Sequence, residues 1–201
     1  ATVRLARLWQ DIVQEYRAQG STHRLTKLKL EMFVDKQKVH TRYPQFSGKA
    51  AQTRSLLRAV AALVMRSSRN TLHDLHRAAC FKCLAQFEEV ISSGPRDFLT
   101  AEDASKASRL LKQALVHYHW LSRWAEENGK MLYPIVPKFH MTYHLAQGCM
   151  YRNPRLTWTF KREDLVGRIA TIGHSVCFGL KATRLSCKLL NKWCVMLHCR
   201  L

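Results

Sequence analysis

Two histidines and two cysteines fall within the eleven residues HDLHRAACFKC (73–83), and both residue types are metal ligands. Their spacing of three, four and three places them on one stripe of an α-helix. At a rise of ~1.5 Å per residue the first and last would lie about 15 Å apart, whereas a tetrahedral zinc ion holds its ligands about 2.0–2.3 Å from one centre. Since the chain has no second C-x2-C, we predict no metal site here but a half-buried helix face made of His73, His76, Cys80 and Cys83.

A second histidine pair, His140 and His144 in KFHMTYH, would share one face of a helix. A zinc metalloprotease motif needs a Glu directly after the first His, and Met141 stands there instead. We therefore interpret the pair as packing or phosphate-facing histidines. Nucleophilic catalysis and nucleotide hydrolysis also lack support, because the chain contains no G-x-S-x-G and no P-loop.

Glu163 and Asp164 are the only acids that follow Glu127. In the first turn of a helix they would complement its dipole. Beside Lys161 and Arg162 they could instead coordinate Mg²⁺ next to a phosphate backbone. Composition favours the dipole interpretation and leaves the magnesium interpretation open.

The charge balance is strongly basic, with 33 Lys and Arg against 14 Asp and Glu, a net charge of +19 over 201 residues. Residues 1–60 hold twelve bases and four acids, and residues 131–201 hold eleven bases and two acids. Residues 61–130 are nearly balanced, with ten bases and eight acids. Because such a field attracts polyanions, the two basic ends predict a nucleic-acid-binding surface. The alternative is a basic protein whose charges are merely solvated.

The elements that must position these residues are predicted to be helices, because apolar residues recur at helical spacing along most of the chain. Thr100 and Asp103 form a capping box, and Gly129 marks the end of the helix that follows it. The sequence also predicts a basic helix over 21–33 and a short strand or extended turn within 148–160. We expect an all-α multi-helix bundle with a helical bundle region at 1–130 and a basic C-terminal helical region at 131–201, or one continuous domain.

Cysteine usage and hydropathy indicate a compartment. Seven cysteines without scaffold spacing favour reduced thiols inside the cell. The longest apolar run, AVAALVM at 59–65, is far shorter than the ~20 residues of a membrane span, so no membrane partner is expected. The amphipathic start, with Asp11 and Glu15, makes a poor secretory signal. We expect an intracellular, preferentially nuclear protein, and the first residue, Ala1, suggests a piece of a longer chain.

Three segments carry a resemblance to a known family: YPQFSGKAAQTRSLLRAVAALV (43–64), VPKFHMTYHLA (136–146) and NPRLTWTFKREDLVGRIATIGHS (153–175). In this order, and with a closing basic helix, they resemble mobile-element transposases of the Kyakuja–Dileera–Zisupton kind. They are also similar to the transposase-like proteins that are abundant in dinoflagellate genomes. The resemblance covers residues 4 to 201 in order of elements and rests on short motifs.

This resemblance implies a ribonuclease H-like parent protein in which three carboxylates bind two Mg²⁺ ions for strand cleavage and transfer. The chain would then be the helical insert and final helices of that fold. Glu163, with Asp164 as its neighbour, would correspond to the third carboxylate, and the other two would lie upstream of Ala1. Two metal ions need several carboxylate oxygens between them, so we expect no catalysis and no cofactor for this chain alone, although the parent protein would use Mg²⁺.

The sequence thus predicts a nucleic-acid-binding helical portion of a transposase-like protein, with DNA favoured over RNA. Phosphate contacts are expected from basic residues in both ends of the chain: Lys27, Lys29, Arg54, Arg58, Lys138, Arg152, Arg155, Lys161, Arg162 and Arg168. The alternative is a protein-interaction module with exposed aromatic anchors, above all Trp120 and Trp124, together with Trp9, Tyr16 and Trp193. A third hypothesis, a magnesium-dependent nuclease, predicts DNA cleavage that requires Glu163.

Overall fold

The computed structural model describes residues 2–33, 43–44, 46–94, 97–157, 187–188, 190–191 and 194. By its contacts the chain divides into two units, Ala1–Thr157 and Trp158–Leu201. In the second unit the few described residues are helical. The sequence-based boundary near residue 130 stays a prediction, and residues up to Thr157 belong with the first unit.

The described residues of the first unit form five α-helices and two short 3₁₀ helices, and no strand occurs among the residues that the structure describes. The all-α prediction is therefore confirmed. The elements are α1 (Thr2–Ala18), η1 (Leu30–Met32), α2 (Ala50–Ser67), α3 (Leu72–Ser93), α4 (Ala101–Glu127), α5 (Pro137–Gly148) and η2 (Pro154–Thr157).

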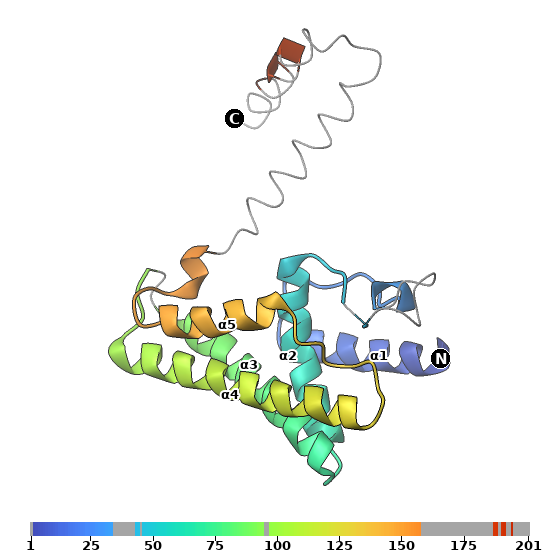
Figure 1. Cartoon of the computed structure of the whole chain (residues 1–201). Helices are drawn as coiled ribbons and strands as arrows, with labels where there is room; N and C mark the ends of the chain where they lie inside the picture. Colours follow the sequence, from blue (N-terminus) through green and yellow to red (C-terminus); the bar gives the residue numbers. More distant parts are fainter. Residues whose placement is uncertain are drawn as a thin grey trace. The chain divides into compact units, whose positions relative to one another are not determined.

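Each helix packs mainly on its neighbour in the sequence (Figure 1). The most extensive packing is between α3 and α4, which lie side by side, and α5 lies along α4. α2 joins α1 to this group by packing against both α1 and α3. Among the described helices, none combines the length and the apolar character that a bilayer crossing demands.

The core between α1 and α2 also explains a wrong prediction. Residues 21–33 do not form a helix; they form an irregular segment that ends in η1. Leu25 and Leu28 of this segment are buried in the same cluster as Ile12 and Tyr16 of α1. Two apolar side chains three residues apart can anchor a loop in a core as well as they can line a helix, so their spacing misled the prediction.

The α3–α4 pair confirms the interpretation of the His/Cys segment as a helix face. Cys80 and Cys83 are buried, and the Cys80 thiol donates to the Ala114 carbonyl oxygen at 3.5 Å. Ala114, on the α4 side of this contact, is buried as well. The N-cap half of the predicted capping box is present too, since the Thr100 hydroxyl accepts the backbone N–H of Asp103 at 3.1 Å and donates to the Asp103 carboxylate at 3.0 Å.

The turn after α5 is fixed to the end of α3 by the fully buried side chain of Asn153. Its Nδ2 donates to the Ile91 carbonyl oxygen at 3.0 Å, and its Oδ1 accepts the backbone N–H of Arg155 at 3.0 Å. The described part of the segment predicted as a strand or extended turn, 148–157, is thus the end of α5, a turn and η2. Buried amide groups of this kind are stabilising only when paired, as they are here.

Candidate nucleic-acid interface

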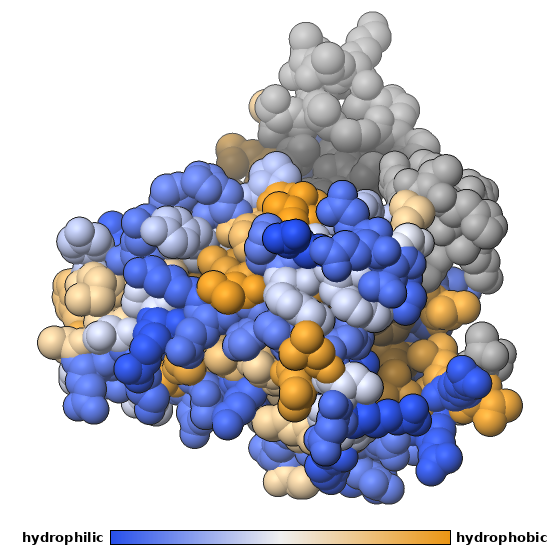
Figure 2. Space-filling model, turned by 60° about the horizontal axis from the view of Figure 1, so that its bottom comes forward, coloured by the Kyte–Doolittle hydropathy of each residue, from blue (hydrophilic) through white to orange (hydrophobic). Residues whose placement is uncertain are grey.

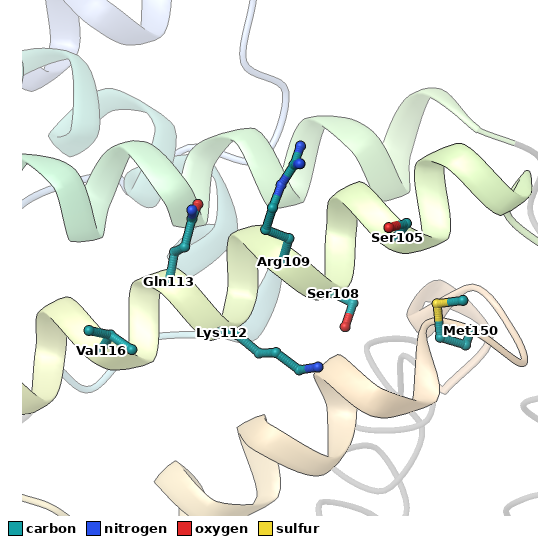
Figure 3. A pocket seen from close by; sticks show the side chains of 7 residues that line it. All are labelled: Ser105, Ser108, Arg109, Lys112, Gln113, Val116 and Met150. Atoms are coloured by element: carbon teal, nitrogen blue, oxygen red, sulfur yellow. The ribbon is translucent and has the colours of Figure 1, made fainter.

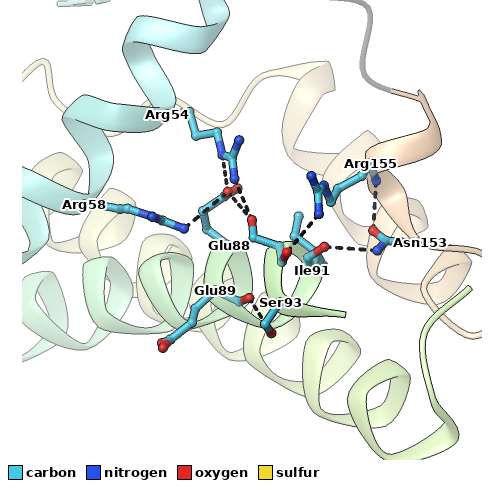
Figure 4. Close-up of polar contacts among 9 residues, drawn as sticks. Arg54, Arg58, Glu88, Glu89, Ile91, Ser93, Asn153 and Arg155 are labelled. Atoms are coloured by element: carbon cyan, nitrogen blue, oxygen red, sulfur yellow. Dashed lines mark hydrogen bonds and ion pairs between the residues drawn. The ribbon is translucent and has the colours of Figure 1, made fainter. Parts of the chain in front are cut away.

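The structure brings three of the predicted phosphate-contacting residues together. Arg54 and Arg58 on α2 and Arg155 on η2 converge at the C-terminal end of α3 (Figure 4). The others in the described part, Lys27, Lys29, Lys138 and Arg152, are exposed in separate segments. The remaining candidates lie outside the described residues: Lys161, Arg162, Arg168 and the carboxylates Glu163 and Asp164.

Glu88 is the centre of this arginine cluster. It is 6% exposed, and Arg54 Nε donates to its Oε1 while Arg58 NH2 lies 3.9 Å from the same atom. The Nη2 atom of Arg54 donates to Ser92 Oγ at 2.6 Å. Arg155 NH1 donates to the Ser92 carbonyl oxygen at 2.9 Å.

These contacts give Arg54 and Arg155 a structural role. Cations at a helix C-terminus complement the partial negative charge of its carbonyl groups, and these two side chains tie α2 and η2 to the end of α3. The Arg58 side chain is 42% exposed and touches Glu88 only at the edge of ion-pair distance. Arg58 is therefore the member of the cluster best placed to meet a phosphate, and the phosphate contacts of the other two stay predictions.

A second basic site lies on α4, where the sequence analysis expected balanced charge. A cavity of about 510 Å³ opens between α4 and the turn after α5 (Figure 3). Its lining is Ser105, Ser108, Arg109, Lys112, Gln113, Val116 and Met150. In Figure 3, Ser108 and Lys112 point toward the side of α5, and Arg109 and Gln113 point away from it.

The basic residues of this site are exposed and spaced by three along α4: Lys106, Arg109 and Lys112. None of the three makes an ion pair with another residue in the described part of the chain. We call them the α4 basic row. Because an α-helix has about 3.6 residues per turn, side chains three residues apart point in directions that differ by about 60° around the helix axis. The α4 basic row therefore winds along the helix face beside the cavity.

The α4 basic row was visible in the sequence, but summing the charge over residues 61–130 hid it. The acids of this helix lie in its two end turns, and none occurs between Asp103 and Glu126. The acids of the first turn, Glu102 and Asp103, complement the positive end of the helix dipole. The charged residues in the middle of α4 are therefore all basic, although residues 61–130 as a whole are nearly neutral.

The aromatic side chains expected as exposed anchors are instead engaged within the fold. The Trp120 ring stacks on His76 with centroids 3.9 Å apart, and the Trp124 ring packs on His73 at 4.1 Å. Tyr16 is only 1% exposed, which corrects its assignment to the surface. A partner bound through Trp120 and Trp124 stays a prediction, Trp9 is half-buried, and Trp193 lies outside the described residues.

Burial between α3 and α4 favours the neutral forms of His76 and Cys80. Burial lowers the pKa of His76, and the charge of His117 adds to this effect. Burial raises the pKa of Cys80 to about 12. A thiol that stays protonated is a poor metal ligand, and within the described residues no group of three or more His, Cys, Asp or Glu side chains could hold a metal ion.

Comparison of the chain with protein-family models, with curated proteins and with solved structures finds no match in any of the three. The transposase resemblance therefore rests on the sequence segments that carry it, and the function must be argued from the side chains.

Proposed function

We propose that this chain binds nucleic acid through the phosphate backbone, as the helical portion of a transposase-like protein. DNA is favoured over RNA as the target, and the nucleus is the corresponding location. The proposal assigns no strand cleavage to this chain by itself. Its parent protein would supply the remaining carboxylates and their Mg²⁺ ions.

The observation that carries this proposal is the α4 basic row beside its cavity. The guanidinium of Arg109 and the ammonium of Lys112 border the same hollow as the hydroxyl-bearing residues Ser105 and Ser108. Arg, Lys and hydroxyl groups are the usual partners of phosphate oxygens. A structural role would normally pair such cations with acids, and within the described part of the chain no acid does so.

The net charge of +19 supports the same conclusion. Both acids that are buried in the described part of the chain, Glu15 and Glu88, are paired with arginines, Arg66 and Arg54. Each pair is neutral, so the field that an approaching polyanion meets comes from the remaining excess of basic residues. Phosphate contacts from Lys and Arg side chains position the nucleic acid without reading its base sequence.

The test is fluorescence anisotropy with a labelled DNA duplex at low salt. Arg109→Gln/Lys112→Gln removes two charges from the cavity, and Arg69→Gln/Lys82→Gln removes the same two residue types from exposed positions elsewhere that form no ion pair within the described part of the chain. We expect roughly tenfold weaker binding for the first variant, because an exposed ionic contact contributes up to about 1 kcal/mol. Equal losses in both variants, or no binding by the wild-type chain, would contradict the proposal.

A further inference from the structure

Another candidate site lies on α5, outside the α4 basic row. The Nε2 atoms of His140 and His144 are 2.8 Å apart, and both side chains are exposed. α5 has only one charged residue, Lys138. The pair therefore lies outside the α4 basic row, and its own chemistry is that of two neighbouring imidazoles.

Gln147 completes a hydrogen-bonded chain with the pair. His144 Nδ1 lies 3.2 Å from Gln147 Oε1, an oxygen that only accepts, so this contact is a hydrogen bond in the tautomer with the proton on Nδ1. In that tautomer the Nε2 atom of His144 presents its lone pair to His140, which donates from its own Nε2. An outer hydrogen bond that leaves Nε2 free is the arrangement found around histidine metal ligands.

We infer that His140 and His144 bind a divalent transition-metal ion through their two Nε2 atoms, with Cu²⁺ and Ni²⁺ favoured over Zn²⁺. The ion takes the place of the proton between the rings. That proton moves from His140 Nε2 to His140 Nδ1, so both rings stay neutral and the pair binds the ion without net proton release.

The number of ligands decides the preference among metals. The two Nε2 atoms lie 2.8 Å apart on adjacent turns of α5, so they can take neighbouring positions of a square-planar or tetragonal Cu²⁺ or Ni²⁺ site. Zn²⁺ sites usually use three or four protein ligands. No third protein ligand joins the pair among the described residues, so water or an added ligand would complete the coordination.

The experiment uses the untagged chain titrated with Cu²⁺, Ni²⁺ and Zn²⁺ by calorimetry in a non-chelating buffer. We expect binding to weaken at least about tenfold in His140→Ala and in His144→Ala, since even disturbing an outer hydrogen bond of a ligand weakens metal sites by 10–100-fold. His119→Ala, which removes an exposed histidine from α4, should bind as the wild type does. Gln147→Ala should weaken binding less than loss of either ligand.

Electron paramagnetic resonance of the Cu²⁺ complex provides a readout that does not depend on any variant folding. Coupling to two equatorial imidazole nitrogens in the wild-type chain supports the inference. A signal without that coupling, a loss in only one of the two histidine variants, or an equal loss in His119→Ala overturns it.

Discussion

The Nδ1 atoms of His76 on α3 and His117 on α4 lie 3.1 Å apart across the interface of the two helices. At this distance one ring donates its proton to the other, so the pair is complete when both rings are neutral. Protonation of both would bring two N–H groups and two charges face to face. The closest helix pair of the fold therefore contains a contact that acid disrupts.

Stability should consequently fall in mild acid. The pKa of His76 is lowered in the folded state, first by burial and then by His117, and burial also lowers the pKa of His73. As the pH falls, these histidines are protonated in the unfolded chain near their ordinary pKa of 6.5, at a higher pH than in the folded chain. The contribution of these groups is thus fully present above pH 6.5 and is lost as the pH falls below it, which urea unfolding at pH 7.5 and pH 5.5 will measure.

The variant His117→Gln tests this cause. It removes the charge that opposes protonation of His76, so the loss of stability between the two pH values should shrink. His119→Gln, an exposed neighbour on α4, should leave the loss unchanged. A loss that is the same in all three proteins would show that the pair is not its origin.

Removing the charge of Glu88 should destabilise the fold. Breaking a buried ion pair costs about 3–5 kcal/mol, and partial exposure reduces that cost. Because the Arg54 side chain is 30% exposed, we expect Glu88→Gln to lower the free energy of unfolding by about 1–3 kcal/mol. The matched control is the exposed neighbour in Glu89→Gln, which should change it by less than about 0.5 kcal/mol.

The loop assignment of residues 21–33 makes its own prediction. Leu28 is 4% exposed in the α1–α2 core, so Leu28→Ala should cost about 2–3 kcal/mol of unfolding free energy in chemical denaturation. Lys27→Ala and Lys29→Ala, on either side of it, should cost little because both side chains are exposed. Lys27→Pro would break a helix at a cost of about 3 kcal/mol, so a small effect of that change would support the loop.

Cleavage of DNA should be absent. A supercoiled plasmid incubated with this chain and Mg²⁺ should stay intact, because the resemblance places two of the three carboxylates outside the chain. Glu163→Gln should then behave as the wild type in the same gel assay. Nicking that requires both Mg²⁺ and Glu163 would instead favour the nuclease hypothesis.

The sequence predicted the helices best where several local signals agree. Thr100 with Asp103 at one end and Gly129 at the other bracket α4, and the backbone of Gly129 is left-handed at φ 61° as a helix end requires. Residues 21–33 failed because one signal, apolar spacing, stood alone. Long-range burial of Leu25 and Leu28 then decided the conformation.

The candidate site was only partly predictable. Basic residues can be counted from the sequence, but their partners cannot, because the contact of Arg54 with Glu88 spans 34 positions. For the same reason the stacking of Trp120 on His76 was not foreseen. The acid-free stretch of α4 was available in the sequence and was lost in a regional average.

The salt dependence of DNA binding tests the central claim most directly. Each phosphate contact on duplex DNA contributes about −0.9 to the slope of log K against log salt. The wild-type chain should show a steep negative slope, and Arg109→Gln/Lys112→Gln should reduce its magnitude by about 1.8, two contacts at that value. A flat wild-type response, or a slope that the double substitution leaves unchanged, would contradict the account.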